Sequence, residues 1–199
     1  MTKDAKNGPY LTGQLLIAMP TMPDIRFARS VVYLCAHSEE GAMGLVVNQA
    51  FDAIDFPGLL KQLGIETEDS DHAKNHVQDQ AIRVQFGGPV EQGRGFVLHS
   101  ADYVQESTMV VDDQVALTAT VDILQSIATG KGPSKRLLAL GYAGWGPGQL
   151  DDEILKNGWL TVESDPALLF NTDLDGKWEK ALDKIGIRPE MLSDTAGHA

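Results

Sequence analysis

The sequence contains one cysteine, Cys35, and few basic residues: Lys and Arg total 16 against 28 Asp and Glu, which gives a net charge of −12 over 199 residues. A single cysteine excludes an intramolecular disulfide and is typical of a reducing compartment. The acidic excess repels the phosphates that supply most non-specific affinity for nucleic acids. Direct nucleic-acid binding therefore needs a local basic patch, and the densest basic cluster is only Lys131, Lys135 and Arg136. We expect no direct contact with nucleic acid.

No long hydrophobic run occurs near the start of the sequence. The first nine residues are polar and lack the apolar centre of a signal peptide. The first apolar stretch, Leu15 to Met19, is far shorter than the roughly 20 residues that a membrane-spanning helix needs. We therefore expect a cytoplasmic protein without a membrane partner, in which residues 1–13 form a flexible segment and residues 14–199 form one domain.

Spacings that identify common enzyme classes are also absent. Ser30 and Ser100 lack the G-x-S-x-G context of a hydrolase nucleophile. His72 and His76 are four residues apart, but they lie in the polar segment 66–80, which has no helical periodicity and offers no third ligand. The sequence therefore predicts no catalytic residue, no metal site and no cofactor.

The stretch Arg136 to Ile154 is typical of a buried strand, a glycine-rich turn and the start of a helix. Such a turn can bind phosphate, because free N–H groups and the helix dipole both favour an anion. Here the common phosphate-loop patterns are missing, and acids occupy residues 151–153, where they complement the dipole and repel phosphate. We interpret the stretch as a structural turn in which Pro147 begins the helix and Trp145 packs. Any cleft in the protein is expected beside this turn.

The remaining periodicity predicts a single α+β domain. The 43% of apolar residues is enough for one substantial core. Gly87 and Gly88 predict a sharp strand exit or a close approach of two backbones. The predicted strands cover 14–19, 31–48 as a hairpin, 82–86, 95–100, 107–119 as a second hairpin, 136–142 and 159–162. The predicted helices begin near Asp55, at Thr120 or Asp122, and near Pro147, Asp165 and Thr172. At Thr172, Asp175 would complete a capping box.

Cys35 and His37 are two residues apart in a predicted strand, so their side chains are expected on one face together with Tyr33. A neighbouring imidazolium lowers the pKa of a thiol, which makes a reactive Cys35 one hypothesis. The commoner alternative is a buried cysteine that packs as a small hydrophobic residue.

Other polar residues lie near the ends of predicted strands. Asn48 and His99 can line a cleft or satisfy structural hydrogen bonds, and the second role is the commoner. Arg26 and Arg29 can hold an anionic ligand or pair with nearby acids such as Asp24, and pairing is again the commoner role.

Several separated stretches together resemble the AlgH/YqgE family of bacterial proteins. The resemblance runs from about Gln14 to the C-terminus and weakens mainly over 66–80. It is carried by Leu15–Pro20, Arg29–Tyr33, His37 with Gly41–Gly44, Asn48, Gly87–Pro89, Arg94–His99, Gly141–Ala143 with Trp145, Gly148–Leu150, Glu153–Ile154 and the tail Ala196–Ala199.

The resemblance implies an α+β domain whose mixed, bifurcated β-sheet curls into a pseudo-barrel with short helices packed outside. It also implies a regulatory role, for which the family has no agreed catalytic residues and no agreed cofactor. No catalytic residue is therefore carried over to this sequence. What carries over is a set of positions in the shared stretches, which are candidate binding residues: Arg29, His37, Asn48, Gly88, His99, Tyr142, Trp145 and Gln149.

Three functions follow from these observations. A non-catalytic regulator that binds a protein or small-molecule partner is favoured, and the negative charge argues that any control of transcription runs through that partner rather than through DNA. The alternative is an enzyme, or an enzyme remnant, with a polar cleft around His37, Asn48 and His99, which requires those side chains to converge. A redox sensor acting through Cys35 is the third hypothesis.

Overall fold

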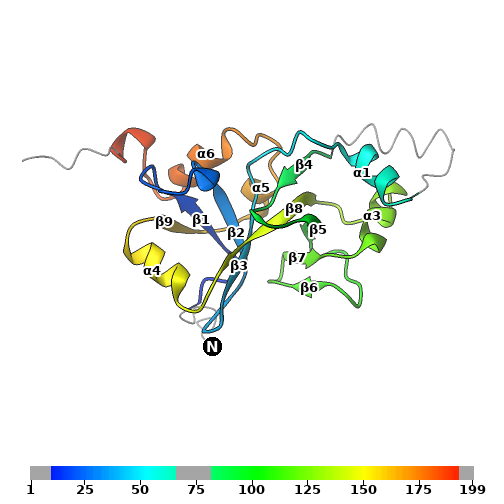
Figure 1. Cartoon of the computed structure of the whole chain (residues 1–199), viewed down its shortest axis with the longest axis horizontal. Coiled ribbons are helices and arrows are strands. Elements are labelled where there is room, and N and C mark those ends of the chain that lie inside the picture. Colours follow the sequence, from blue (N-terminus) through cyan, green and yellow to red (C-terminus); the bar gives the residue numbers. More distant parts are fainter. Residues whose placement is uncertain (1–9, 66–81, 193–199) are drawn as a thin grey trace, which may run out of the picture.

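The computed structural model describes residues 10–65 and 82–192, and these form a curled sheet with short helices packed against it (Figure 1). The predicted flexible residues 1–9, the polar segment 66–80 with His72 and His76, and the tail 196–199 lie outside the described part. Residues 10–13, also predicted to be flexible, run beside the second strand: the Gly13 N–H donates to the Leu34 carbonyl at 2.8 Å.

Nine strands in the described part of the chain join one sheet, in the order β6-β7-β5-β8-β3-β2-β1-β9 with β4 added beside β8. The strands are β1 (Gln14–Ala18), β2 (Val31–Ser38), β3 (Gly41–Val46), β4 (Val84–Phe86), β5 (Val90–Ser100), β6 (Met109–Val110), β7 (Val115–Thr118), β8 (Arg136–Trp145) and β9 (Trp159–Glu163). The helices are η1 (Ile25–Phe27), α1 (Phe56–Gln62), α3 (Val121–Ala128), α4 (Gln149–Leu155), α5 (Pro166–Leu169), α6 (Lys177–Asp183) and η2 (Pro189–Met191).

The sheet forks along β8. One edge of β8 pairs with β5, while its other edge pairs first with β4 and then with β3. The β4 partners are Leu138–Leu140 and the β3 partners are Ala143–Trp145, so the change of neighbour falls at Gly141 and Tyr142. Because β4 runs parallel to β8 and the other pairs are antiparallel, the sheet is mixed and bifurcated, as predicted.

The sheet buries side chains on both faces. Its inner face encloses the largest core cluster, to which Leu15, Leu98 and Leu137 contribute together with Trp178 of α6. The outer face carries two smaller clusters: α1 and α3 cover β4, β5 and β8, while α4 covers β1, β2 and β3. Figure 1 shows these two helical groups at opposite ends of the molecule. The predicted curled sheet with short helices is therefore observed as a half-barrel, in which α1, α3 and α4 pack outside, whereas α5 and α6 pack against the inner cluster.

Helix starts follow the predicted caps in two cases. The Asp55 side chain accepts from the Gly58 N–H at 2.8 Å, and Asp165 accepts from the Leu168 N–H at 2.8 Å. The predicted start at Pro147 is wrong, because β8 continues to Trp145 and α4 begins only at Gln149, behind Gly148 in the left-handed region with φ 69°.

The start of the last helix also differs from the prediction. Asp173 accepts from the Gly176 N–H at 3.1 Å, and α6 begins at Lys177, so the proposed capping box of Thr172 and Asp175 is not formed. No helix within residues 10–65 and 82–192 has both the length and the apolarity to span a bilayer.

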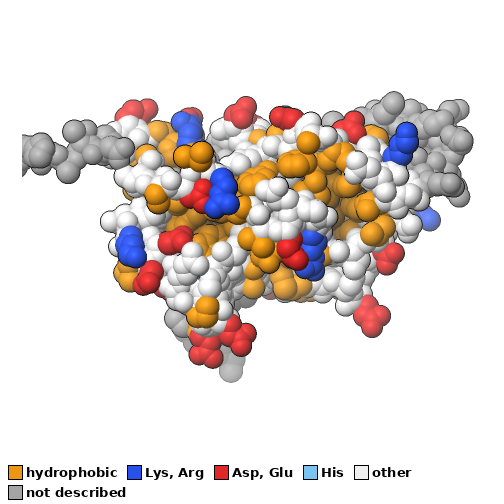
Figure 2. Space-filling view, viewed as in Figure 1, with side chains coloured by type: hydrophobic (Ala, Val, Ile, Leu, Met, Phe, Trp, Pro, Cys, Tyr) orange, Lys and Arg blue, Asp and Glu red, His pale blue; other side chains and the backbone are white. Residues whose placement is uncertain are grey.

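The face shown in Figure 2 is mixed in character. Apolar side chains gather across its middle, between charged side chains of both signs. The net negative charge is therefore not spread evenly over this face, and apolar surface is accessible between the charges.

Candidate functional site

A pocket of about 560 Å³ lies between η1 and α4, beside the turn that follows β8. Its position agrees with the cleft expected from the sequence. Its lining combines aromatic and apolar side chains with four charged ones, Asp24, Arg26, Glu153 and Lys156. The lining residues are Thr21, Met22, Pro23, Asp24, Arg26, Phe27, Pro89, Val90, Gly144, Trp145, Gln149, Glu153, Lys156, Gly158 and Trp159.

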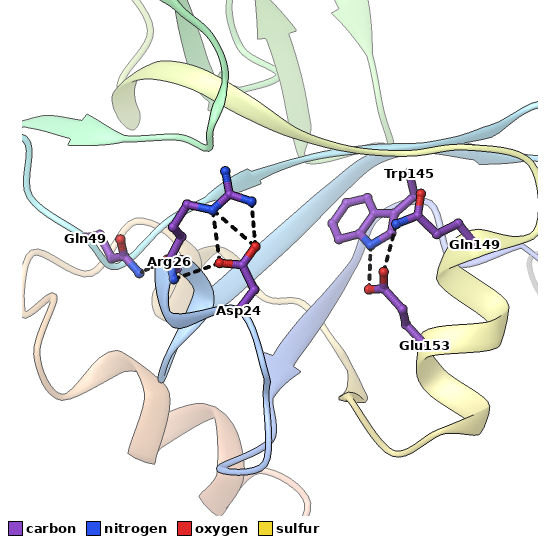
Figure 3. A network of polar contacts seen from close by, with 6 residues as sticks. All are labelled: Asp24, Arg26, Gln49, Trp145, Gln149 and Glu153. Carbon is purple, nitrogen blue, oxygen red and sulfur yellow. Dashed lines mark hydrogen bonds and ion pairs between the residues drawn. The ribbon is translucent and has the colours of Figure 1, made fainter.

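Glu153 organises one wall of the pocket. The indole N–H groups of Trp145 and Trp159 both donate to its Oε2, at 2.9 and 2.8 Å. Its other oxygen, Oε1, accepts from the Gln149 side-chain amide at 2.9 Å. The two indole rings meet edge to face, with centroids 5.9 Å apart. One carboxylate thus fixes two aromatic rings and an amide, as Figure 3 shows for Trp145, Gln149 and Glu153.

The spacing in α4 produces this arrangement. Gln149 and Glu153 are four residues apart, which places them on one face of the helix. The Gln149 Oε1 also accepts from the Gly146 N–H at 3.0 Å, which ties the helix start to the preceding turn. The wall is therefore built from the end of β8, the first residues of α4 and the start of β9.

An ion pair forms the opposite wall. Arg26 Nη2 lies 2.6 Å from Asp24 Oδ2, and Arg26 Nε donates to both carboxylate oxygens. Hydrogen bonds from Arg26 lower the pKa of Asp24, so this acid is ionised at neutral pH. The pairing of Arg26 with Asp24 is the commoner of the two roles considered from the sequence. Figure 3 shows this pair across the pocket from Trp145 and Glu153.

The backbone conformation of Gly141 determines which face of the sheet the Trp145 side chain occupies. Before it, Leu137 and Ala139 belong to the inner cluster. Strict alternation along the strand would then place Trp145 on the inner face too. Gly141 instead has φ 74° and shifts the alternation by one residue, so Tyr142 packs on the inner side and Trp145 joins the outer cluster.

Gly88 makes room for this irregular strand. A Cβ on Gly88 would lie 2.0 Å from the Tyr142 carbonyl carbon, and a Cβ on Gly141 would lie 2.3 Å from the Gly88 carbonyl oxygen. The two backbones therefore approach as only glycines allow, which is one of the alternatives given for Gly87 and Gly88. Gly88 therefore contacts the backbone of Gly141 and Tyr142 in β8, and its own atoms do not line the pocket.

The side chains of His37 and Asn48 do not meet. Asn48 bridges two backbone groups: its Oδ1 accepts from the Val31 N–H at 2.8 Å and its Nδ2 donates to the Arg29 carbonyl at 2.9 Å. His37 lies six residues beyond Val31 along β2, roughly 20 Å at the usual rise per residue. Its Nδ1 accepts from the Leu11 N–H at 3.1 Å.

His99 lies on β5, separated from β2 by β8 and β3. It is fully buried, with Nε2 2.9 Å from the Thr118 hydroxyl and Nδ1 2.9 Å from the Ser100 carbonyl. Burial is the main cause that lowers its pKa, so the ring is neutral at pH 7. His99 therefore has its own structural partners, and the polar cleft hypothesised around His37, Asn48 and His99 is not assembled.

Arg29 and Tyr142 lie outside the pocket lining as well. The Arg29 guanidinium stacks 4.5 Å from the Trp178 ring centroid and pairs with Glu179 at 2.8 Å. Tyr142 meets Phe96 edge to face at 5.8 Å. Of the eight candidate binding residues, the pocket thus brings together Trp145 and Gln149.

Cys35 lies in the inner core with 2% of its surface exposed. The pairing of β2 with β3 shifts register between Leu34 and Ala36, which interrupts the alternation that predicted Cys35 and His37 on one face. His37 Nε2 instead lies 3.7 Å from Asp151. Burial raises the pKa of the Cys35 thiol to about 12, which disfavours the reactive thiolate.

Sequence reasoning did not single out Glu153, Asp24 or Trp159 as site residues. The available signal was the Gln149/Glu153 spacing, which places two polar side chains on one helical face beside tryptophan-containing strands. In the described ranges, no group of three His, Cys, Asp or Glu side chains is arranged to hold a metal ion.

The fold and the pocket define a class: a single-domain α+β protein with a forked, curled sheet and an aromatic-walled pocket at the end of the central strand β8. The AlgH-like family model matches residues 15–190. A UPF0301 protein of Bradyrhizobium diazoefficiens is 58% identical over 191 residues, which cover 96% of this chain and 89% of that protein. One from Rhodopseudomonas palustris is 56% identical over 195 residues, covering 98% and 89%. The chain belongs to the AlgH-like family.

Solved structures agree with this assignment. The solution structure of the AlgH protein from Pseudomonas aeruginosa has a TM-score of 0.78 and 39% identity, and the match covers 100% of both chains. A crystal structure from Corynebacterium diphtheriae has a TM-score of 0.68 at 21% identity, covering 96% of this chain and 95% of that one, which is a likeness of fold.

Proposed function

We propose that this protein is a non-catalytic cytoplasmic regulator that binds a protein or small-molecule partner in the pocket between η1 and α4. The observation that carries the proposal is the pair of indoles, Trp145 and Trp159, held by Glu153. Both indoles are almost fully buried, at 7% and 2% exposed, so they form a rigid base for the pocket. The half-buried Met22 and Phe27 of the same lining supply apolar contact area.

The chemistry of the lining supports binding rather than catalysis. The residues that line the pocket in the described structure include no His, Cys or Ser. Asp24 is paired with Arg26, and both oxygens of Glu153 accept hydrogen bonds from the wall itself. A general base needs a free, suitably placed acceptor, and a nucleophile needs a neighbouring base. Recognition of a partner needs neither.

The charged side chains of the lining indicate which chemical groups a partner carries. Arg26, with 58% of its side-chain surface accessible, and Lys156 are both exposed cations of the lining. A partner with an apolar or aromatic group for Met22 and for Phe27, which packs on Trp159, and with an acidic group for Arg26 and Lys156 fits this distribution. The net charge of −12 supports regulation through such a partner rather than through DNA.

Affinity capture with matched variants tests the proposal. Wild-type protein, Arg26→Glu and Arg94→Glu are each incubated with native bacterial cytoplasm, and all retained proteins and metabolites are identified. Arg94 is the control because it is a similarly exposed arginine, at 56%, paired with a nearby acid but outside the pocket. A partner retained by wild type and Arg94→Glu but lost from Arg26→Glu supports the proposal. Equal retention by all three contradicts the assignment of the pocket.

A gel-shift assay tests the claim about DNA. The purified protein is expected to give no shift at moderate salt. Tight binding that weakens steeply as salt is added would contradict regulation through a partner, because that dependence is characteristic of direct phosphate contacts.

A further inference from the structure

A second pocket, of about 610 Å³, lies where β4 and β8 begin, next to the segment that joins α5 to α6. It is separate from the pocket described above and shares no lining residue with it. Its lining residues are Ile82, Arg83, Gln85, Ser134, Lys135, Arg136, Leu137, Phe170, Asn171, Thr172 and Leu174.

Three cations meet in this pocket. Lys135 and Arg136 form part of the densest basic cluster in the sequence, and Arg83 is distant from them along the chain. Parallel strands begin at the same edge of a sheet, and the pairing of Val84 with Leu138 brings Arg83 beside the start of β8. The fold thus concentrates positive charge that the sequence separates.

The lining residues of this pocket include no Asp or Glu, in a protein with a net charge of −12. The acids that contact lining residues are already engaged. Asp102 accepts from the Ser100 hydroxyl at 2.6 Å and from the Ser134 N–H at 3.2 Å. Asp173 pairs with Lys180 at 2.7 Å. The three cations are therefore not neutralised by a carboxylate of the lining.

Two side chains of this pocket contain unpaired polar atoms. Gln85 Oε1 and Arg136 Nε are the buried side-chain atoms that lack a hydrogen-bond partner within the described structure, and Gln85 as a whole is only 7% exposed. A buried polar atom without a partner costs stability. Arg136 Nε is a donor that a phosphate oxygen satisfies, and the bond from Arg136 Nη1 to the Pro133 carbonyl at 2.8 Å holds the guanidinium in place. Gln85 Oε1 is an acceptor, so Gln85 binds a phosphate only when its amide turns the NH₂ group toward the ligand.

We propose that this pocket binds a small organic phosphate, namely a phosphate monoester whose remaining part is apolar or planar. Guanidinium groups match the geometry of phosphate oxygens, and three cations suit a dianion better than a single carboxylate. Ile82, Leu137, Phe170 and Leu174 supply apolar surface for the organic part. The volume lies within the range of small-molecule sites.

Titration with phenyl phosphate, followed by calorimetry and by amide chemical shifts, tests the proposal. Phenyl phosphate is expected to bind saturably and more tightly than either phenol or inorganic phosphate. Arg83→Gln and Lys135→Gln, both at exposed positions, are expected to weaken its affinity about five- to tenfold each. Lys131→Gln is the matched control, since it removes a nearby cation that does not line the pocket. Thermal unfolding of each variant verifies that the fold is retained.

Several outcomes would overturn the proposal: no saturable binding of phenyl phosphate, equal losses in Lys131→Gln and Lys135→Gln, or inorganic phosphate binding as tightly as the ester. Binding of a single-stranded oligonucleotide without binding of phenyl phosphate would also overturn it, in favour of a nucleic-acid surface. The Arg26→Glu variant is expected to bind phenyl phosphate normally, so failure here is distinguishable from failure of the proposed function.

Discussion

The Trp145 indole and the Glu153 carboxylate meet at 2.9 Å although one ends β8 and the other lies in the second turn of α4. The same carboxylate oxygen accepts from Trp159. The two hydrogen bonds to Glu153 therefore join β8, α4 and β9 at one carboxylate. They hold the two indole rings of the pocket wall in place in the absence of a partner.

Replacement of Glu153 by Gln is expected to loosen this wall. A neutral amide oxygen accepts more weakly than a carboxylate, and its NH₂ group cannot accept from an indole or from Gln149. We expect a loss of about 2 kcal/mol in the free energy of unfolding, together with altered tryptophan fluorescence. Urea denaturation measures the first effect. Asp152→Asn, an exposed change on the same helix, is the control, and equal stability of the two variants would contradict the role of Glu153.

Gly141 is predicted to be irreplaceable for two separable reasons. Gly141→Ala adds both a strained positive φ and a clash with the Gly88 carbonyl, so we expect a loss above about 3 kcal/mol. Gly148→Ala has the same backbone strain, at φ 69°, with no atom near the added Cβ, and should cost about 1 kcal/mol. Gly93→Ala has neither problem and should be nearly neutral. Any other order of unfolding free energies contradicts the account of the β8 junction.

Local signals in the sequence predicted much of the fold. Asp55 and Asp165 cap the expected helices, and the hairpin expected over 31–48 forms as β2 and β3. These features depend on residues close together in the chain. The end of β8 was missed, because a glycine-rich stretch is equally compatible with a turn and with an irregular strand, and only the approach of Gly88 decides between them.

The candidate site was predicted in part. Trp145 and Gln149 lie in the pocket, but His37, Asn48 and His99 have separate structural partners. Convergence depends on tertiary contacts that no local pattern encodes. Arg29 illustrates the limit: the sequence placed it among nearby acids, whereas its partner, Glu179, is 150 residues away.

Lys177 gives the protein a pH-dependent stability. Its Nζ is buried and donates to the Val47 and Leu169 carbonyls at 2.8 Å each. Burial lowers its pKa to about 8 from the ordinary 10.5, and the charge of Asp173 opposes this shift. Between these two values the unfolded chain binds more protons than the folded protein, so Lys177 makes stability rise as pH increases through that window.

The difference between wild type and Lys177→Met isolates this effect. From pH 8 to 10.5 the wild type should gain stability relative to the variant, by an amount on the order of 2–3 kcal/mol. Urea denaturation at several pH values measures the difference, in which the titration of other groups cancels. A difference that stays constant over this range would show that Lys177 titrates normally.

Cys35 is expected to be inert in the folded protein. The thiol is 2% exposed and its pKa is raised to about 12, so native protein should react with a thiol reagent only as fast as it unfolds. Urea should accelerate labelling in step with unfolding. The folded form also retains the proton that the unfolded thiol releases above about pH 9, so stability should fall there relative to Cys35→Ala. Rapid labelling of the native protein would restore the redox-sensor hypothesis.

The central claim, that the pocket between η1 and α4 binds the partner, is tested most directly by the ¹⁵N-indole signals of the three tryptophans in the chain. Trp145 and Trp159 line the pocket, whereas Trp178 donates to the Ala18 carbonyl in the inner core and serves as an internal reference. Titration with the captured partner is predicted to shift the Trp145 and Trp159 signals and to leave that of Trp178 in place. Binding that leaves both pocket signals unmoved, or that moves only Trp178, would contradict the claim.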